Sequence, residues 1–367
     1  MKYTAEQIFS ALKHVRHPAE GKDIVTLNMV SDLRISDGAV AFVLTFRKWN
    51  DPTMMSVRKG SEKALKYYVD PNIEVDIRVE SLEAPELKEA PLPLARNIIA
   101  IASGKGGVGK STVAANLAVA LALQGYRVGL IDADVYGPSV PKMFGAEAEK
   151  PMSREVDGRH LIIPIEKYNV KLLSVGFFVK PEDAVVWRGP MATAALKQLF
   201  QQADWGELDF LLLDLPPGTG DVHLTMVQEL PVTGAVIVST PQEVALVDAV
   251  KGINMFRSEK INVPILGLVE NMAWFTPEDA PEKRYYLFGR EGCKTLAEKE
   301  QLALLGQIPI VGSICESGDS GVPIALNENH PAGKAFRQLA AEVVGRVEAR
   351  NAAAEPTRRV TMDKHSH

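Results

Sequence analysis

The sequence predicts an α/β protein: a mostly parallel, doubly wound P-loop sheet flanked by helices, preceded by a small α+β domain. Three observations lead to this prediction. From Asn97 onward, short continuous apolar runs alternate with helical patterns, and a glycine-rich loop follows the first run. On the N-terminal side of these runs, a proline-rich stretch separates an N-terminal region that has its own apolar pattern. Continuous hydrophobicity is typical of parallel strands that helices cover on both faces.

Residues 1–82 are expected to form the small domain. Ile8, Leu12 and Val15 lie at helical spacing, and the pattern over residues 57–68 predicts a second helix. The predicted strands are residues 24–30, 39–46 and 73–79. The expected order is therefore helix, strand, strand, helix, strand.

Residues 83–96 are predicted as a linker, because their prolines prevent a continuous helix and favour extended backbone. The larger domain is then expected to span residues 97–350. Its predicted strands are residues 98–102, 128–131, 210–213, 235–238 and 265–269. A closing helix is expected to start near Pro331, and residues 351–367 are predicted as a flexible tail because the apolar periodicity stops.

Composition and charge exclude several classes of protein. The 41 Lys and Arg against 46 Asp and Glu give a net charge of -5, which argues against a nucleic-acid or anionic-membrane partner. Only two cysteines occur, Cys293 and Cys315, which excludes a disulfide scaffold and fits a reducing compartment. No apolar run has membrane-spanning length, and the start lacks a signal-peptide core. We therefore expect a cytoplasmic protein.

The glycine-rich loop has the pattern of a phosphate-binding P-loop. It matches G-x-x-x-x-G-K-[ST] between a predicted strand and a predicted helix. Glycines allow successive backbone N–H groups to converge on phosphate oxygens, and Lys110 is expected to reach the β- and γ-phosphates while Ser111 binds Mg²⁺. The expected ATP-binding residues here are Gly104, Lys105, Gly106, Gly107, Val108, Gly109, Lys110, Ser111 and Thr112.

Two predicted strands end in acidic residues, at the sheet edge where an open parallel sheet binds ligands. Asp214 is expected to hold Mg²⁺, as the acid of a Walker B strand does. Asp134 is expected to position the attacking water, with Asp132 near the magnesium; a helix N-cap is the alternative for Asp132. The glycine-rich residues 217–220 are predicted to form a mobile switch near the γ-phosphate.

Several motifs together resemble a known family. The second lysine of the loop, Lys105, is similar to the signature lysine of the deviant Walker A loop in MinD-like NTPases. The motifs at residues 132–141, 187–191, 213–221, 223–225 and 269–272 resemble those of Mrp/ApbC iron–sulfur cluster carrier ATPases. The segments 21–25 and 28–30 are similar to the small iron–sulfur-assembly domain that often precedes them.

The resemblance implies an activity, cofactors and partners. It implies a homodimer that binds ATP and Mg²⁺, hydrolyses ATP slowly and passes a labile iron–sulfur cluster to apoproteins, together with assembly factors. Lys105 would reach the partner protomer's nucleotide and act in catalysis with Lys110, Asp132 and Asp134; an exposed lysine is the alternative. Asn271 resembles the family's adenine-contacting asparagine, and a plain turn residue is the alternative.

The sequence departs from the family at the cluster ligands. The usual C-P-x-C pair, which supplies four thiolates from two protomers, is absent, since residues 273–289 contain no cysteine. The small domain's usual cysteine is also missing near residues 51–55. Cys293 is the remaining candidate, because entry into a helix could increase thiolate character, but a small residue packed in the fold is the favoured interpretation for both cysteines.

The sequence is compatible with two functions, and a third is disfavoured. The first is a cluster carrier with ATPase activity. The second is a nucleotide-switched scaffold for assembly factors or client proteins that never holds a cluster. The third, positional organisation of DNA or membrane, is disfavoured because the tail has few large apolar residues and the net charge is negative.

Overall fold

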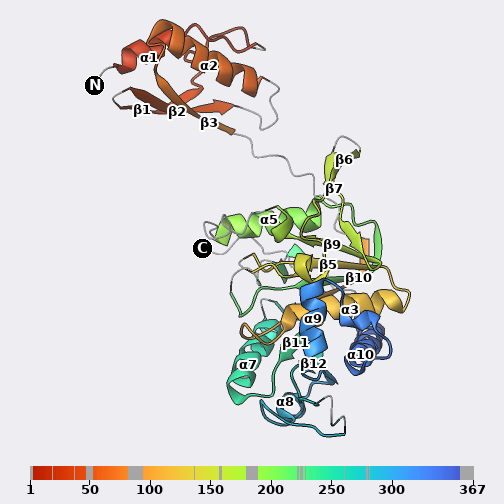
Figure 1. Ribbon diagram of the computed structural model, residues 1–367. Coiled ribbons are helices and arrows are strands. Elements are labelled where there is room, and N and C mark those ends of the chain that lie inside the picture. The colour runs from red at the N-terminus through yellow and green to blue at the C-terminus, as the bar shows by residue number, and fades with distance from the viewer. Residues whose placement is uncertain are drawn as a thin grey trace. The chain divides into compact units, whose positions relative to one another are not determined.

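The chain divides into two units, Met1–Glu89 and Ala90–His367. The computed structural model, drawn in Figure 1, describes residues 3–18, 20–36, 38–46, 53–81, 94–135, 137–156, 159–178, 189–220, 223, 226–227, 229–259, 261–277, 280 and 282–355. The division falls inside the expected linker. Strand β4 begins at Leu94, so the last three residues of that stretch belong to the first strand of the larger unit.

The small unit packs two helices on a three-stranded sheet. Its elements are α1 (Ala5–Leu12), β1 (Val30–Ser36), β2 (Ala39–Phe46), α2 (Met54–Tyr68) and β3 (Glu74–Ser81). Strand β2 lies in the middle, antiparallel to β1 and parallel to β3. The apolar stripe of α1 packs into the core, where Ile8 and Leu12 are fully buried with Leu44 and Leu65.

The order of elements in the small unit agrees with the prediction, but the first strand does not lie where it was expected. Residues 24–28 form turns, and β1 starts at Val30. The cause is Asp23, whose Oδ1 accepts hydrogen bonds from the backbone N–H of Val25 and Thr26, at 3.1 and 2.8 Å. Such local bonds favour a turn over an extended ladder.

The larger unit is built on an eight-stranded sheet in the order β13-β12-β11-β4-β10-β5-β9-β8. Every neighbouring pair is parallel except β8 and β9, so the predicted mostly parallel α/β fold is confirmed. The strands are β4 (Leu94–Ala102), β5 (Val128–Asp132), β8 (Ile165–Lys167), β9 (Val170–Ser174), β10 (Glu207–Asp214), β11 (Gly234–Ser239), β12 (Ile265–Glu270) and β13 (Leu304–Gln307). A separate hairpin joins β6 (Ser153–Val156) and β7 (Arg159–Ile162).

Helices cover both faces of this sheet (Figure 1). The helices are α3 (Lys110–Leu123), α4 (Val140–Met143), α5 (Gly189–Gln201), α7 (Glu243–Arg257), α8 (Gly292–Lys299), α9 (Gly312–Ser320) and α10 (Pro331–Ala353), with short 3₁₀ turns at Val175–Phe177 and Ile324–Leu326. Alternate residues of β4 enter opposite cores: Ile99 packs with α3 and α10, and Ile98 with α5, α7 and α8. This double burial explains the continuous apolar runs.

The closing helix α10 starts at Pro331 as expected and continues to Ala353, three residues past the expected domain end. Most of the tail, residues 356–367, lies outside the described residues. Among those that are described, no helix is both long and apolar enough to cross a membrane.

Candidate nucleotide-binding site

The glycine-rich loop connects β4 to α3, and its glycines are required by the backbone. Gly107 and Gly109 have φ of +81° and +78°, in the left-handed region that favours glycine. At Gly104 a Cβ atom would lie 2.1 Å from the carbonyl of Asp248 in α7, so only glycine fits against that helix. Lys110 is the first residue of α3, which directs the loop toward the positive end of a helix dipole.

Lys110 and Asp214 form a buried ion pair, with Nζ 2.5 Å from Oδ1. Lys110 Nζ also lies 3.3 Å from the hydroxyl of Ser111. Burial raises the pKa of Asp214, and the charge of Lys110 opposes that rise. The other carboxylate oxygen, Oδ2, is buried without a hydrogen-bond partner among the described residues. A carboxylate oxygen and a hydroxyl at one place are the ligand types that Mg²⁺ prefers, so these residues fit the ion.

Asp132 is next to Asp214 in the sheet, at the end of β5, and is fully buried. Its carboxylate accepts hydrogen bonds from the N–H of Asp134 (3.1 Å), the N–H of Val140 (3.2 Å) and the hydroxyl of Ser174 (3.0 Å). Burial, followed by the charge of Asp214, raises the pKa of Asp132 to about 7. Because Val140 is the first residue of α4, the Asp132 carboxylate bonds to the start of that helix, and it also lies beside Asp214.

Asp134 and Lys105 line a cavity of about 220 Å³ over the phosphate loop. Asp134 Oδ1 accepts a hydrogen bond from the N–H of Gly137 at 3.2 Å. Lys105 is half-buried, and its ammonium group makes no hydrogen bond or ion pair with the described residues. The cavity thus presents one carboxylate and one unpaired cation beside the loop.

The expected switch, residues 217–220, lies against the phosphate loop together with residues 215 and 216, and the name switch covers all six residues, 215–220. The N–H of Leu215 donates to the Ile101 carbonyl at 3.1 Å, and the N–H of Gly218 donates to the Ser103 carbonyl at 3.0 Å. Pro217 lines the same cavity as Lys105 and Asp134. Residues 215–218 therefore contact the phosphate loop directly, so a movement of that loop would be passed on to them.

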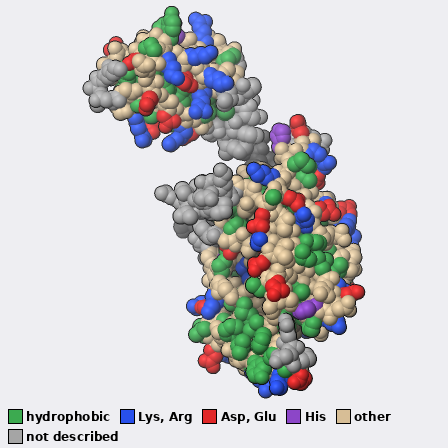
Figure 2. Space-filling model, in the orientation of Figure 1, with side chains coloured by type: hydrophobic (Ala, Val, Ile, Leu, Met, Phe, Trp, Pro, Cys, Tyr) green, Lys and Arg blue, Asp and Glu red, His purple; other side chains and the backbone are tan. Residues whose placement is uncertain are grey.

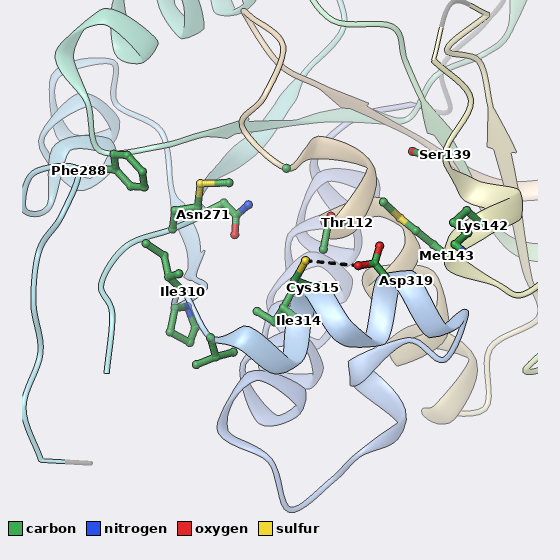
Figure 3. A pocket seen from close by; sticks show the side chains of 15 residues that line it. Thr112, Ser139, Lys142, Met143, Asn271, Phe288, Ile310, Ile314, Cys315 and Asp319 are labelled. Carbon is green, nitrogen blue, oxygen red and sulfur yellow. Dashed lines mark hydrogen bonds between the residues drawn. The ribbon is translucent and has the colours of Figure 1, made fainter. Parts of the chain in front are cut away.

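A larger cavity of about 610 Å³ adjoins the other side of the loop at Gly109 and Thr112 (Figure 3). Asn271 lies on its wall, and its side-chain amide donates to the carbonyl of Val108 at 2.8 Å. The remaining walls are mainly apolar and come from α4, α9 and the segments that follow β12 and β13. They include Met143, Met272, Phe288, Ile310 and Ile314. An apolar cavity beside a phosphate loop suits the flat base of a nucleotide.

Cys315 was not expected at this site. It lies on α9, is exposed and lines the larger cavity, with Sγ 3.7 Å from a carboxylate oxygen of Asp319 (Figure 3). A packed small residue is therefore the wrong interpretation for Cys315. No local signal in the sequence marks this position, because it depends on where α9 packs.

Cys293 is a packed core residue, the interpretation favoured from the sequence, and is unsuited to be a cluster ligand. The gain in thiolate character considered for the start of α8 does not occur. The thiol is fully buried, with Sγ 3.7 Å from the Thr240 carbonyl. Burial, followed by the nearby charge of Glu270, raises the pKa of the thiol well above its usual range. Cys293 packs in the core under α7 and α8, whereas Ile314, next to Cys315, packs against the core on the opposite face of the sheet.

The described part of the chain contains no group of three or more His, Cys, Asp and Glu side chains able to hold a metal ion. Parts of the motifs on which the family resemblance rests lie outside the described residues. These are residues 51–52, 136, 187–188, 221–222 and 224–225. His223 is described and is buried behind the switch.

Comparisons with known proteins agree with this geometry. Residues 95–344 match the model of the NUBPL iron-transfer P-loop NTPases, and residues 5–78 match that of iron–sulfur cluster assembly proteins. An iron–sulfur cluster carrier protein of Synechocystis sp. is 41% identical over 350 residues, 94% of this chain and 98% of that protein.

Solved structures show the same fold. A nucleotide-binding protein of Archaeoglobus fulgidus in complex with ADP is 39% identical, with a TM-score of 0.55, over 65% of this chain and 90% of that one. The cell division ATPase MinD of Pyrococcus furiosus is 26% identical, with a TM-score of 0.51, over 68% of this chain and 98% of that one.

Proposed function

Because the chain belongs to the family of NUBPL iron-transfer P-loop NTPases, we propose that it is an ATP-hydrolysing carrier that delivers iron–sulfur clusters to apoproteins. The observation that supports this most directly is the buried Lys110–Asp214 pair beneath a complete phosphate loop. In the nucleotide-free chain Lys110 and Asp214 pair with each other. When nucleotide binds, the phosphates would contact Lys110 and Mg²⁺ would bind Asp214. Proteins related over nearly the whole chain are named as cluster carriers.

Different residues of the site bind the phosphates, hold Mg²⁺ and orient the attacking water. The loop N–H groups and Lys110 bind the β- and γ-phosphates, for which Lys110 exchanges its contact with Asp214. Asp214 and Ser111 would hold Mg²⁺, which supplies charge neutralisation at the phosphates. Asp134, on the cavity over the loop, orients the attacking water, because this transition state needs an aligned water more than a strong base.

A homodimer is part of the proposal. Lys105 has an ammonium group with no partner among the described residues of its own chain, and it borders the phosphate cavity. Helix α7 packs on the same loop through Asp248, and its Val244 and Val247 side chains are 65% and 60% exposed. Figure 2 shows hydrophobic side chains gathered over this part of the larger unit. A second copy covering this face would bring its own Lys105 toward the nucleotide.

The cluster is the cargo, and this chain supplies few ligands for it. Of its two cysteines, Cys293 is fully buried, which leaves Cys315 as the exposed thiol of each chain. Two exposed thiols in a dimer are fewer than the four ligands of a [4Fe–4S] cluster. We therefore propose that the carrier holds its cargo with thiols contributed from outside, by a small thiol, an assembly factor or the receiving apoprotein.

Anaerobic reconstitution tests this function. Purified chain is incubated with iron, sulfide and a small thiol, desalted, and assayed for iron and for thiolate-to-iron absorption, beside Cys293→Ala and Cys315→Ala. We expect retained iron in the wild type and in Cys293→Ala, and a clear loss in Cys315→Ala. A featureless spectrum with no retained iron in the wild type would reject the carrier function.

One observation favours a second candidate, a nucleotide-switched scaffold that never holds a cluster. The described residues contain no group of three or more His, Cys, Asp and Glu side chains that could hold a metal ion, and one of the two thiols is buried in the core. A scaffold requires nucleotide-dependent binding of client proteins but no thiol. Client maturation by a chain with both cysteines replaced by alanine would support the scaffold, and its loss with intact ATP turnover would support the carrier.

A further inference from the structure

His223 is a buried histidine that lies directly behind the switch. It is 1% exposed, and its ring Nε2 lies 2.7 Å from the carbonyl oxygen of Pro216. Its backbone N–H donates to the carbonyl of Gly220 at 3.0 Å. His223 therefore contacts this segment at two points, with its ring at Pro216 and with its backbone N–H at Gly220.

The ring is a hydrogen-bond donor in this contact. A carbonyl oxygen can only accept, so Nε2 carries the proton. The other ring nitrogen, Nδ1, is buried without a partner among the described residues, which suits the neutral ring. Burial lowers the pKa of His223; the carbonyls of Pro216 and Gly220 and the charge of Asp134 oppose this, and the charge of Lys110 reinforces it.

The switch has few backbone bonds of its own. Pro216 and Pro217 are consecutive prolines, so neither residue has an N–H group that could tie this stretch to the sheet or the loop. Among the described residues, the N–H groups of Leu215 and Gly218 donate to the carbonyls of Ile101 and Ser103. The imidazole of His223 holds the Pro216 carbonyl between these two bonds.

We propose that His223 is a positioning residue for ATP hydrolysis, which holds the Pro216 carbonyl so that the switch stays docked on the phosphate loop. The inference rests on the proposed ATPase function and assigns His223 no contact with nucleotide. Loss of the donor leaves a buried carbonyl without a partner, and the switch is then expected to spend less time with the Gly218 N–H bonded to the Ser103 carbonyl at the start of the phosphate loop.

The test compares three variants of the full chain. His223→Gln keeps an N–H donor of similar reach, His223→Leu fills the space without a donor, and His223→Ala removes both. We expect turnover to fall about tenfold in the Leu and Ala variants with KM for ATP and ADP affinity changed by less than about twofold, and to recover in the Gln variant. His17→Leu, at a buried histidine of the small unit, is the control and is expected to retain turnover.

Amide hydrogen exchange provides a readout that does not need turnover. In the nucleotide-free chain, the Gly218 amide is expected to exchange about tenfold faster in His223→Leu than in the wild type or His223→Gln. Equal exchange and equal turnover in wild type and His223→Leu would overturn the positioning role, as would a Gln variant as slow as the Leu variant. A wild type without ATP turnover would instead reject the proposed ATPase, and the exchange rates alone would then decide on His223.

Discussion

The side-chain amide of Asn271 donates a 2.8 Å hydrogen bond to the carbonyl of Val108, which joins the end of β12 to the phosphate loop. The two groups are packed so closely that a Cβ atom on Gly109 would lie 2.2 Å from Asn271 Nδ2. Asn271 was expected from the family resemblance to contact the base. In this structure it also holds the loop that carries the phosphate-binding N–H groups.

Replacement of Asn271 by alanine should weaken nucleotide binding. The Val108 carbonyl would lose its partner, and the loop N–H groups would be less well ordered before the phosphates bind. We expect about a tenfold lower affinity for ADP, measured by titration with a fluorescent nucleotide. Asn271→Asp should lose at least as much, since it places a carboxylate oxygen against a carbonyl oxygen.

The matched control is Asn351→Ala, which removes an asparagine bond of 2.9 Å to Asn97 outside both nucleotide cavities. Its ADP affinity should equal that of the wild type. Wild-type affinity in Asn271→Ala would show that the bond to Val108 does not order the loop.

Replacement of Lys110 and replacement of Lys105, the two lysines of the phosphate loop, should impair different steps. Lys110→Ala removes the cation paired with Asp214 and should eliminate measurable ATP binding. Lys105→Ala should keep ATP affinity within about twofold, because the Lys105 side chain makes no hydrogen bond or ion pair with the described residues and its carbonyl, which accepts from Ser103, is kept. The variant should nevertheless lose ATP-driven dimerisation and turnover. Size-exclusion chromatography with ATP and Mg²⁺, beside nucleotide titration, measures both. Equal loss of affinity in the two variants would contradict a role for Lys105 across the dimer.

The parts of the fold that sequence reasoning located are those in which one local pattern dominates. Residues 98–102 are apolar without interruption because helices cover both faces of β4, and this pattern distinguishes them from a surface strand. Strands β9 and β13 were not predicted, since each has only four or five residues and no distinctive pattern. The strand expected at residues 24–30 was displaced by the side-chain bonds of Asp23.

In the site, too, residues within short motifs could be predicted from the sequence, whereas contacts between distant residues could not. The phosphate loop and the acids after β5 and β10 carry their chemistry in short segments, so their neighbourhood was predictable. The contact of Asn271 with Val108 joins residues 163 positions apart, and Cys315 reaches the larger cavity only through the packing of α9. No spacing in the sequence encodes such contacts. The burial of Cys293 likewise follows from the packing of α7 and α8.

The stability of the larger unit should depend on pH through Asp209. Hydrogen bonds from the Arg127 side chain, and then from its backbone N–H, lower the pKa of Asp209 to about 2. A depressed pKa means that the ionised carboxylate stabilises the folded state above its unfolded pKa, near 4, and that this contribution is lost as pH falls toward about 2. Arg127→Met should therefore lower the thermal midpoint more at pH 6 than at pH 2.5.

The control for this pH effect is Arg34→Met, which removes the exposed pair of Arg34 with Asp32 in the small unit. Exposed pairs contribute little, so its midpoint should follow the wild type at both pH values. If the thermal midpoint of Arg127→Met differs from that of the wild type by the same amount at pH 6 and at pH 2.5, the Arg127–Asp209 contact is not the source of a pH-dependent stability.

The two thiols should differ sharply in reactivity toward an alkylating reagent. Cys315 is exposed on the wall of the larger cavity, whereas Cys293 is fully buried and its pKa is raised, so it is a protonated thiol at neutral pH. We expect one reactive thiol in the folded chain and two in denaturant, with Cys293 at least about 100-fold slower because it reacts only after local unfolding. Mass spectrometry of the labelled chain measures both rates.

Nucleotide and single-cysteine variants complete this test. ADP bound in the larger cavity would shield Cys315, so its labelling should slow in proportion to occupancy, and Cys315→Ala should leave no fast thiol. Cys293→Ala should label like the wild type, because the thiol it removes is closed to the reagent. Fast labelling of folded Cys315→Ala would mean that the core under α8 opens readily. Cys293 would then return as a candidate ligand for the cluster.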